Sequence, residues 1–179
     1  MNDKSYDVIM AGGGVMGCAT AFYLLRSDPT LKVAIIEMDA TYEKNSTVLS
    51  DGNTRLQFNL KENIQISQYG LDKLTTFSEE MAVDGIKVRI GFRQEGNLFL
   101  SDQENIKNAQ AGLAMQQSLG CNVEWLTPDE ISDRFPLYNK ESFAGGTFGP
   151  LDGTMDSHAV LMGFKNKAID LGATFIEAE

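Results

Sequence analysis

The sequence has little of several residue types that mark specialised classes of protein. Its 179 residues include one histidine, which excludes a metal site built from several histidine ligands. There are only two cysteines, Cys18 and Cys121, which are far apart and form no Cys-x-x-Cys pair. A disulfide framework is therefore not expected, and we predict two reduced thiols in a cytoplasmic location.

Basic residues and long apolar runs are also scarce. Fifteen Lys and Arg stand against 25 Asp and Glu, for a net charge of −10, which argues against nucleic acid or an anionic membrane as partner. No apolar run reaches the length of a membrane span. Residues 15–18 resemble a lipoprotein cleavage box, but three glycines interrupt the preceding apolar segment and Asp3 and Asp7 make its start acidic. An export signal is therefore not favoured.

The first 37 residues have the pattern of a βαβ unit. Residues 7–11 form a short apolar run that ends in glycines, which is typical of a buried parallel strand. Residues 15–26 have helical spacing, and Pro29 follows them as a helix breaker. Residues 32–37 form a second apolar strand. We expect a right-handed crossover between the two strands.

The rest of the chain predicts a mixture of helices and strands. A polar loop over 39–59 is long enough to suggest a functional role. A β-hairpin is expected from residues 87–92 and 97–100, whose connection contains Gly96. Gly120 is expected to end a helix, and Thr127 and Glu130 to start another as a capping box. Further helices are expected at 62–80, 102–119 and 157–171, and further strands at 123–126, 144–149 and 173–176.

A glycine fingerprint lies between the first strand and the first helix. Gly12 permits a tight turn, Gly14 lets a pyrophosphate approach the backbone, and Gly17 lets the helix pack closely on the sheet. The helix N-terminus then faces the phosphates with free N–H groups and the positive end of its dipole. The predicted cofactor-binding residues of this turn are Gly12, Gly13, Gly14, Val15, Met16 and Gly17.

Glu37 strengthens this interpretation. It ends the second strand, twenty residues after Gly17, where an acid accepts hydrogen bonds from adenosine ribose hydroxyls. An acid at this position also disfavours a 2′-phosphate, and hence NADP. The pattern therefore predicts a dinucleotide site rather than a glycine turn beside an exposed glutamate.

The spacing does not separate FAD from NAD, but the next segment resembles a known family. Residues 45–55 are similar to the second FAD-contact loop of the D-amino-acid oxidase/sarcosine oxidase (DAO) family, as are residues 12–17 and 60–64. The resemblance extends over nearly the whole chain and is nearest to the "FAD-dependent oxidoreductase domain-containing" branch. FAD is therefore the expected cofactor.

The resemblance also implies positions along the cofactor. Ser46, Thr47 and Ser50 would lie along the ribityl-pyrophosphate part of FAD. Gly52 and Arg55 would lie near the isoalloxazine ring, where an arginine can stabilise a reduced, anionic flavin. The structural alternatives are a solvated linker for the loop and an ion pair for Arg55.

The sequence departs from the family pattern at two positions. Asn53 stands where relatives often have a glycine, and Phe58 stands where sarcosine-oxidase-type relatives have an arginine that helps hold the substrate carboxylate. An N-methyl amino acid is therefore not a safe substrate assignment. Some flavoproteins attach FAD through His or Cys, but we expect His158 to be a surface or capping residue and Cys18 to pack as a small apolar side chain.

Together these features predict an α/β fold: a Rossmann-like FAD-binding βαβ unit followed by part of an α+β substrate domain. We expect residues 1–84 to be the FAD-binding segment, 85–150 a partial substrate domain, and 151–179 a helix and strand returning to the FAD domain. Because relatives are about twice as long, we expect the chain to be a truncated, N-terminal portion.

The expected reaction of the intact enzyme is hydride transfer to flavin N5 from a C–H beside the nitrogen of a small amine or amino acid. No catalytic residue is assigned, because no general base can be argued from this segment. Two alternatives stay open: a non-catalytic binding or assembly protein that keeps the flavoprotein fold, and, less favoured, an NAD-dependent dehydrogenase.

Overall fold

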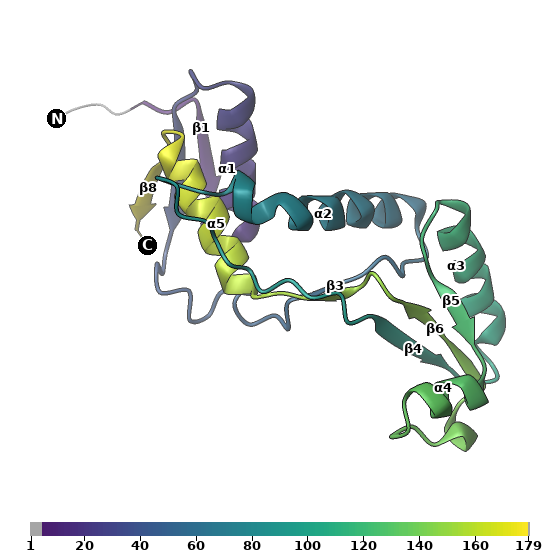
Figure 1. Ribbon diagram of the computed structural model, residues 1–179. Coiled ribbons are helices and arrows are strands. Elements are labelled where there is room, and N and C mark those ends of the chain that lie inside the picture. The colour runs from purple at the N-terminus through teal and green to yellow at the C-terminus, as the bar shows by residue number, and fades with distance from the viewer. Residues whose placement is uncertain (1–4, 179) are drawn as a thin grey trace. The chain divides into compact units, whose positions relative to one another are not determined.

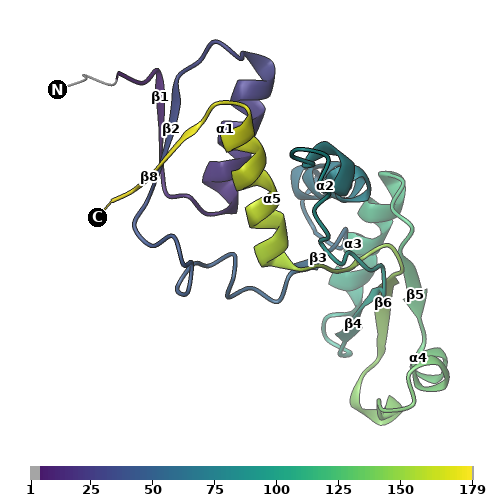
Figure 2. The same ribbon diagram turned by 60° about the vertical axis from the view of Figure 1, so that its left-hand side comes forward.

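The computed structural model describes residues 5–178, and the chain folds into helices and sheets (Figures 1 and 2). It forms two compact units. The first comprises Met1–Gly52, Thr75–Gly91 and Met155–Glu179, and the second comprises Asn53–Leu74 and Phe92–Thr154. The chain thus crosses between the units four times. The cofactor and substrate roles assigned to segments 1–84, 85–150 and 151–179 stay a prediction.

The first unit is built on a parallel sheet with strand order β1-β2-β8. The strands are β1 (Val8–Ala11), β2 (Val33–Glu37) and β8 (Thr174–Glu177). Four of the five residues of the central strand β2 are buried, as expected for a strand covered on both faces. Helix α1 (Val15–Ser27) connects β1 to β2, and helix α5 (Ser157–Asp170) precedes β8. The predicted βαβ unit is confirmed.

Helices α1 and α5 pack against each other around aromatic side chains. The ring of Phe164 lies 5.7 Å from that of Phe22 and 5.0 Å from that of Phe77, measured between centroids. A Cβ atom at Gly163 would come within 2.6 Å of the Phe77 ring, so only glycine allows this approach. The core of the first unit therefore joins side chains from the start, middle and end of the sequence.

The second unit contains a three-stranded antiparallel sheet. Its order is β4-β6-β5, from β4 (Asn97–Ser101), β6 (Gly145–Gly149) and β5 (Glu124–Leu126). Helices α3 (Ile106–Ser118) and α4 (Pro128–Arg134) follow β4 and β5, respectively. The remaining elements are a 3₁₀ turn at Lys140–Ser142 and the short antiparallel pair β3 (Asn53–Thr54) and β7 (Gly153–Thr154).

Helix α2 (Lys61–Glu80) contributes its first part to the second unit and its last turns to the first. It is the longest helix that the structure describes. In the part of the chain covered by residues 5–178, no helix has both the length and the apolar character needed to cross a bilayer.

The predicted hairpin between residues 87–92 and 97–100 is wrong. Residues 87–92 form no strand, and β4 instead pairs with β6, from Asn97 opposite Gly149 to Ser101 opposite Gly145. All five residues of β6 are buried, and a Cβ at Gly146 would lie 2.8 Å from the Phe99 carbonyl oxygen. The glycine-rich strand thus fits closely beside β4. Strand β4 therefore pairs with a strand about fifty residues later, because this pairing buries more surface than a hairpin with residues 87–92 would.

The helix-end signals are confirmed. Thr127 caps α4, its hydroxyl accepts from the Glu130 N–H at 3.3 Å, and the Glu130 carboxylate accepts from the Thr127 N–H at 2.7 Å. Gly120 has a φ of +82° just after α3, the left-handed conformation that glycine adopts readily.

We predict that Thr127→Ala lowers the free energy of unfolding of the second unit by about 1 kcal/mol, because the α4 N-terminus loses its cap. Urea unfolding followed by the fluorescence of Trp125, the only tryptophan, measures this directly, since it lies on β5 just before α4. Thr127→Ser keeps the hydroxyl and should behave as wild type. Equal stabilities of wild type and Thr127→Ala would contradict the role of the cap.

Candidate cofactor site

The turn from β1 into α1 is shaped by two glycines. Gly12 has a φ of +103°, a conformation that strains other residues, and its N–H donates to the Ile36 carbonyl at 2.8 Å. A Cβ at Gly17 would overlap the Gly12 carbonyl oxygen. The first turn of α1 therefore lies directly against the backbone of the turn, and a side chain at either position would disturb it.

Gly13 and Glu37 lie together beneath this turn. The Glu37 carboxylate is buried, and its Oε2 accepts from the Gly13 N–H at 2.8 Å while its Oε1 accepts from the Asp39 N–H at 3.1 Å. A Cβ at Gly13 would come within 2.9 Å of the Glu37 Cβ. Glu37 therefore ties the end of β2 to the glycine turn, a structural role that the sequence did not indicate.

The polar loop after β2 reaches the N-terminus of α1. The Thr47 hydroxyl accepts from the Val15 N–H at 3.3 Å, and the Asn45 side chain accepts from the Thr47 N–H at 2.9 Å. A Cβ at Gly14 would lie 3.0 Å from the Asn45 amide nitrogen. Asn45 is not among the predicted site residues. An asparagine that bonds to the backbone two residues later is a recognisable turn signal and could have indicated it.

The remaining loop residues of the first unit lie further along the same segment. Ser46 and Ser50 are exposed, and the Ser50 hydroxyl donates to the Thr47 carbonyl at 2.8 Å. Gly52 has a φ of +65°, and a Cβ there would overlap the Met155 carbonyl oxygen. The backbones of Gly52 and Met155 also share a hydrogen bond of 3.0 Å. Glycine is required here by backbone packing.

The α1 N-terminus has the properties of an anion site. Its N-cap residue is Gly14, which provides no side-chain cap, and within residues 5–178 its first turn carries no acidic side chain. The positive end of the helix dipole is thus not neutralised by an acid of its own turn. Met16, which follows Val15, is 78% exposed. These residues fit the pyrophosphate of a dinucleotide.

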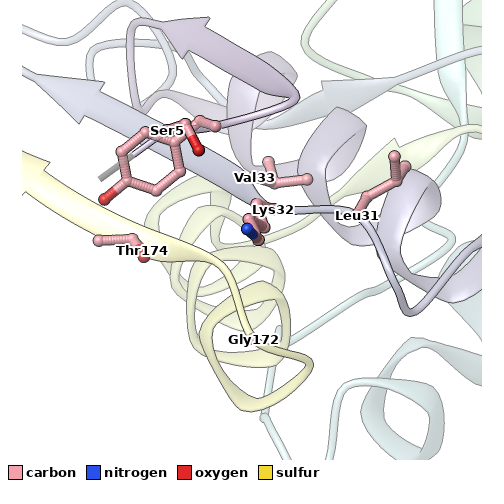
Figure 3. Close-up of a pocket in the computed structure, with 7 residues that line it drawn as sticks. Ser5, Leu31, Lys32, Val33, Gly172 and Thr174 are labelled. Carbon is pink, nitrogen blue, oxygen red and sulfur yellow. The ribbon is translucent and has the colours of Figure 1, made fainter. Parts of the chain in front are cut away.

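A hollow of about 340 Å³ lies at the other end of the same sheet (Figure 3). It is bordered by residues at the amino ends of the strands, whereas the glycine turn follows the carboxyl end of β1. Dinucleotides bind at the carboxyl ends of parallel strands, so this hollow is not the cofactor site. Its lining residues are Ser5, Tyr6, Leu31, Lys32, Val33, Gly172 and Thr174.

Comparison with known proteins identifies the family. The family described as FAD dependent oxidoreductase (DAO) matches residues 7–179. The chain belongs to the DAO family. This family is FAD dependent, so the resemblance seen in the fingerprint and the 45–55 loop is confirmed, and with it the expected cofactor.

Curated relatives of this DAO-family chain are considerably longer. It is 32% identical over 178 residues to FAD-dependent oxidoreductase domain-containing protein 1 of Bos taurus, covering 97% of this chain and 37% of the relative. It is 28% identical over 188 residues to sarcosine oxidase subunit beta of Arthrobacter sp, covering 97% of this chain and 43% of the relative. The chain thus spans about two fifths of the length of these relatives.

Solved structures share the fold. L-proline dehydrogenase from P. horikoshii superposes with a TM-score of 0.83 at 26% identity, covering 97% of this chain and 44% of that chain. Glycine oxidase from Geobacillus kaustophilus gives a TM-score of 0.79 at 24% identity, covering 96% and 46%. The expected α/β fold class, with a Rossmann-like unit and part of a second domain, is confirmed.

Arg55, the last predicted site residue of this DAO-family chain, belongs to the second unit. Its guanidinium carbon lies 4.7 Å from the centre of the Phe58 ring and 5.1 Å from that of Phe99. The guanidinium is thus stacked against two aromatic rings, an arrangement that stabilises and orients a cation. Phe58, which departs from the family pattern, forms one of these two stacking partners.

The two residues considered for covalent attachment have ordinary surroundings. The Cys18 thiol is fully buried and donates to the Gly13 carbonyl at 3.0 Å. Burial raises the pKa of the Cys18 thiol to about 11, so it is protonated at neutral pH and a weak nucleophile. His158 is exposed and is the second residue of α5, whose cap is the side chain of Asp156.

A cation between aromatic rings lies behind the turn and was not predicted. The Lys165 ammonium is 3.8 Å from the Phe175 ring centre and 4.9 Å from that of Tyr42. The Phe175 ring in turn would touch a Cβ at Gly13, at 3.0 Å. No sequence signal joins these residues, because Tyr42 lies in a loop more than 120 residues before Lys165 on α5 and Phe175 on β8.

We predict that Gly17→Ala destabilises the first unit by about 2 kcal/mol, because the new methyl group overlaps the Gly12 carbonyl. Thermal unfolding followed by circular dichroism measures the effect. Gly70→Ala is a matched control: within the described structure a Cβ there meets nothing within 4 Å, so this change in α2 should add about 0.5–1 kcal/mol. Equal effects of the two substitutions would contradict the steric role of Gly17.

The Cys18 thiol gives a prediction for alkaline pH. Its pKa rises from 9.0 to about 11 on folding, so the stabilising protonated form is retained by the folded state while the unfolded state ionises. Stability should therefore be lost as pH rises from 9 to 11, and Cys18→Ala should show a smaller loss over that interval. Chemical denaturation at several pH values measures both slopes, and identical slopes would refute the assignment.

Proposed function

We propose that this chain binds FAD and forms the cofactor-docking part of an oxidoreductase that oxidises a C–N bond of an amine or amino acid. The observation that carries the proposal is the N-terminus of α1, which has a glycine as its N-cap residue and, within residues 5–178, no acid in its first turn, and which lies beside the Gly12 turn and the Asn45–Thr47 segment. The names of its relatives support the substrate class, because sarcosine oxidase, glycine oxidase and L-proline dehydrogenase are all named after amino acids.

In this proposal the first unit holds the adenosine diphosphate end of FAD. The N–H groups of the α1 first turn donate to the pyrophosphate, and the glycine turn keeps side chains out of its way. The Glu37 carboxylate accepts from the ribose hydroxyls. Each of its oxygens accepts one backbone N–H, and an ionised carboxylate has about four lone-pair sites, so acceptor capacity is left for the ribose.

Other residues would serve the rest of the cofactor. Ser46, Thr47 and Ser50 would border the ribityl chain, and Gly52 would leave room beside it. Arg55 would supply positive charge near the flavin ring, with its guanidinium oriented by Phe58 and Phe99. When bound, FAD supplies the redox chemistry by accepting a hydride at N5. The chain's contribution is to bind, orient and tune, and we assign it no general base.

A second substrate class is favoured by two relatives named L-2-hydroxyglutarate dehydrogenase. L-2-hydroxyglutarate dehydrogenase of Caenorhabditis briggsae is 31% identical over 138 residues, covering 73% of this chain and 30% of the relative. By its name this protein oxidises a hydroxy acid, so a C–O bond would take the place of the C–N bond. Bleaching of bound flavin by amino acids, and not by 2-hydroxy acids, would support the first class, and the reverse result would favour the second.

The absorbance of the purified protein after incubation with FAD tests cofactor binding. We expect a visible flavin spectrum that persists through gel filtration, and Glu37→Ala should weaken FAD binding by about tenfold or more because the ribose loses a charged acceptor. Glu43→Gln is the control, because Glu43 is an exposed acid in the same loop. A folded protein that takes up no FAD would overturn the proposal. Bound flavin that no substrate bleaches would favour a non-catalytic binding protein.

A further inference from the structure

The second unit contains a fully buried carboxylate, Asp152, that the sequence did not single out. It lies between β6 and β7 and is 0% exposed. Its Oδ1 accepts from the Leu56 N–H at 2.7 Å, and its Oδ2 accepts from the Gln57 side-chain amide at 2.8 Å. The carboxylate therefore holds two successive residues from a segment almost a hundred residues earlier in the chain.

Gln57 requires an acceptor at this position. Its amide nitrogen also donates to the Asn97 carbonyl at 2.9 Å, and its oxygen is buried with no hydrogen-bond partner among residues 5–178. Turning the amide over would bring that oxygen against the Asn97 carbonyl. The orientation of the Gln57 amide is thus fixed, and the Asp152 carboxylate accepts the second hydrogen bond from its NH₂ group. A Cβ at Gly149 would intrude on both, 2.8 Å from Asp152 Oδ2 and 2.9 Å from the Gln57 nitrogen.

The segment that Asp152 holds also carries Arg55. Leu56 and Gln57 follow Arg55 directly, and the Phe58 N–H donates back to the Leu56 carbonyl at 2.9 Å in a tight turn. Fixing Leu56 and Gln57 therefore sets the direction from which Arg55 leaves the backbone and the place of the Phe58 ring. The other ring against the guanidinium, Phe99, lies on β4, which begins at the Asn97 that Gln57 contacts.

The charges of Arg55 and Asp152 also bear on how Arg55 is positioned. Within residues 5–178, the contacts found for the Arg55 guanidinium are with the Phe58 and Phe99 rings, and no ion pair with a carboxylate is among them. Burial raises the pKa of Asp152, while its hydrogen bonds to Gln57 and Leu56 and the nearby positive charge of Arg55 oppose that rise. Asp152 thus interacts with Arg55 through space without occupying its donors.

We propose that Asp152 is a positioning residue for Arg55. It holds residues 55–58 so that the guanidinium lies against Phe58 and Phe99 with its N–H groups available to an anionic group. The identity of that group as the flavin ring rests on the proposed function, whereas the positioning itself does not.

The first test needs no cofactor. Stacking against two phenyl rings shifts the side-chain proton resonances of Arg55 upfield, and NMR of the labelled 179-residue chain reads this shift. We expect Asp152→Ala to abolish the shift and Asp133→Asn, which removes an exposed acid from the same unit, to preserve it. An unchanged Arg55 shift in folded Asp152→Ala would overturn the proposal.

If Asp152→Ala fails to fold, two milder variants, Asp152→Asn and Gly149→Ala, still test the proposal. The asparagine keeps an acceptor for Leu56 but presents a donor to Gln57, so we expect a partial loss of the shift. Gly149→Ala leaves Asp152 in place and crowds its contact with Gln57, so it should also reduce the shift. Wild-type Arg55 resonances in both variants would overturn the positioning role.

The second test uses the protein loaded with FAD. The reduction potential of the flavin should fall in Arg55→Met and by a similar amount in Asp152→Ala, and the double variant should show no further fall. Additive falls would overturn action through Arg55. If the protein binds no FAD, the proposed function fails while the NMR result still decides the positioning role. If Arg55→Met leaves the potential unchanged, only the assignment of the anionic group fails.

Discussion

The close approach of α1 to the Gly12 carbonyl is the constraint on which the first unit depends. Because Gly17 has no side chain, the first turn of α1 lies directly against the turn that follows β1, and the N-cap residue, Gly14, offers no side chain to its N–H groups. The same closeness brings the end of β2 beneath the turn, where Glu37 binds the Gly13 N–H. The proposed contacts of α1 with the pyrophosphate and of Glu37 with the ribose would both depend on this one backbone contact.

In each unit a buried carboxylate accepts hydrogen bonds from a loop and fixes its position. Glu37 accepts two backbone N–H groups beside the glycine turn, and Asp152 accepts a backbone and a side-chain N–H beside Arg55. A buried charge is costly unless hydrogen bonds satisfy it, so such residues fix the geometry around them closely. In both units the ordered segment carries the residues proposed to meet the cofactor.

Family membership and geometry support different parts of the functional argument. The DAO family match gives the cofactor and the fold, and it covers residues 7–179. The names of some relatives refer to an amino acid or a hydroxy acid, and the chain spans only 30% to 43% of the length of these relatives. In our proposal the described residues contribute the docking of the cofactor and an oriented guanidinium, and the substrate class is a proposal that rests on the relatives.

The sequence by itself determined the features that depend on near neighbours. The strand, glycine turn and helix at the start, the capping box at Thr127 and the glycine after α3 are set by local sterics and local hydrogen bonds. Tertiary structure alone decided that β4 pairs with β6, because burial against a distant glycine-rich strand outweighed a local turn signal. It also decided the role of Asp152, whose partners Leu56 and Gln57 are 96 and 95 residues away. No local pattern records such a contact, since it exists only once the chain has folded.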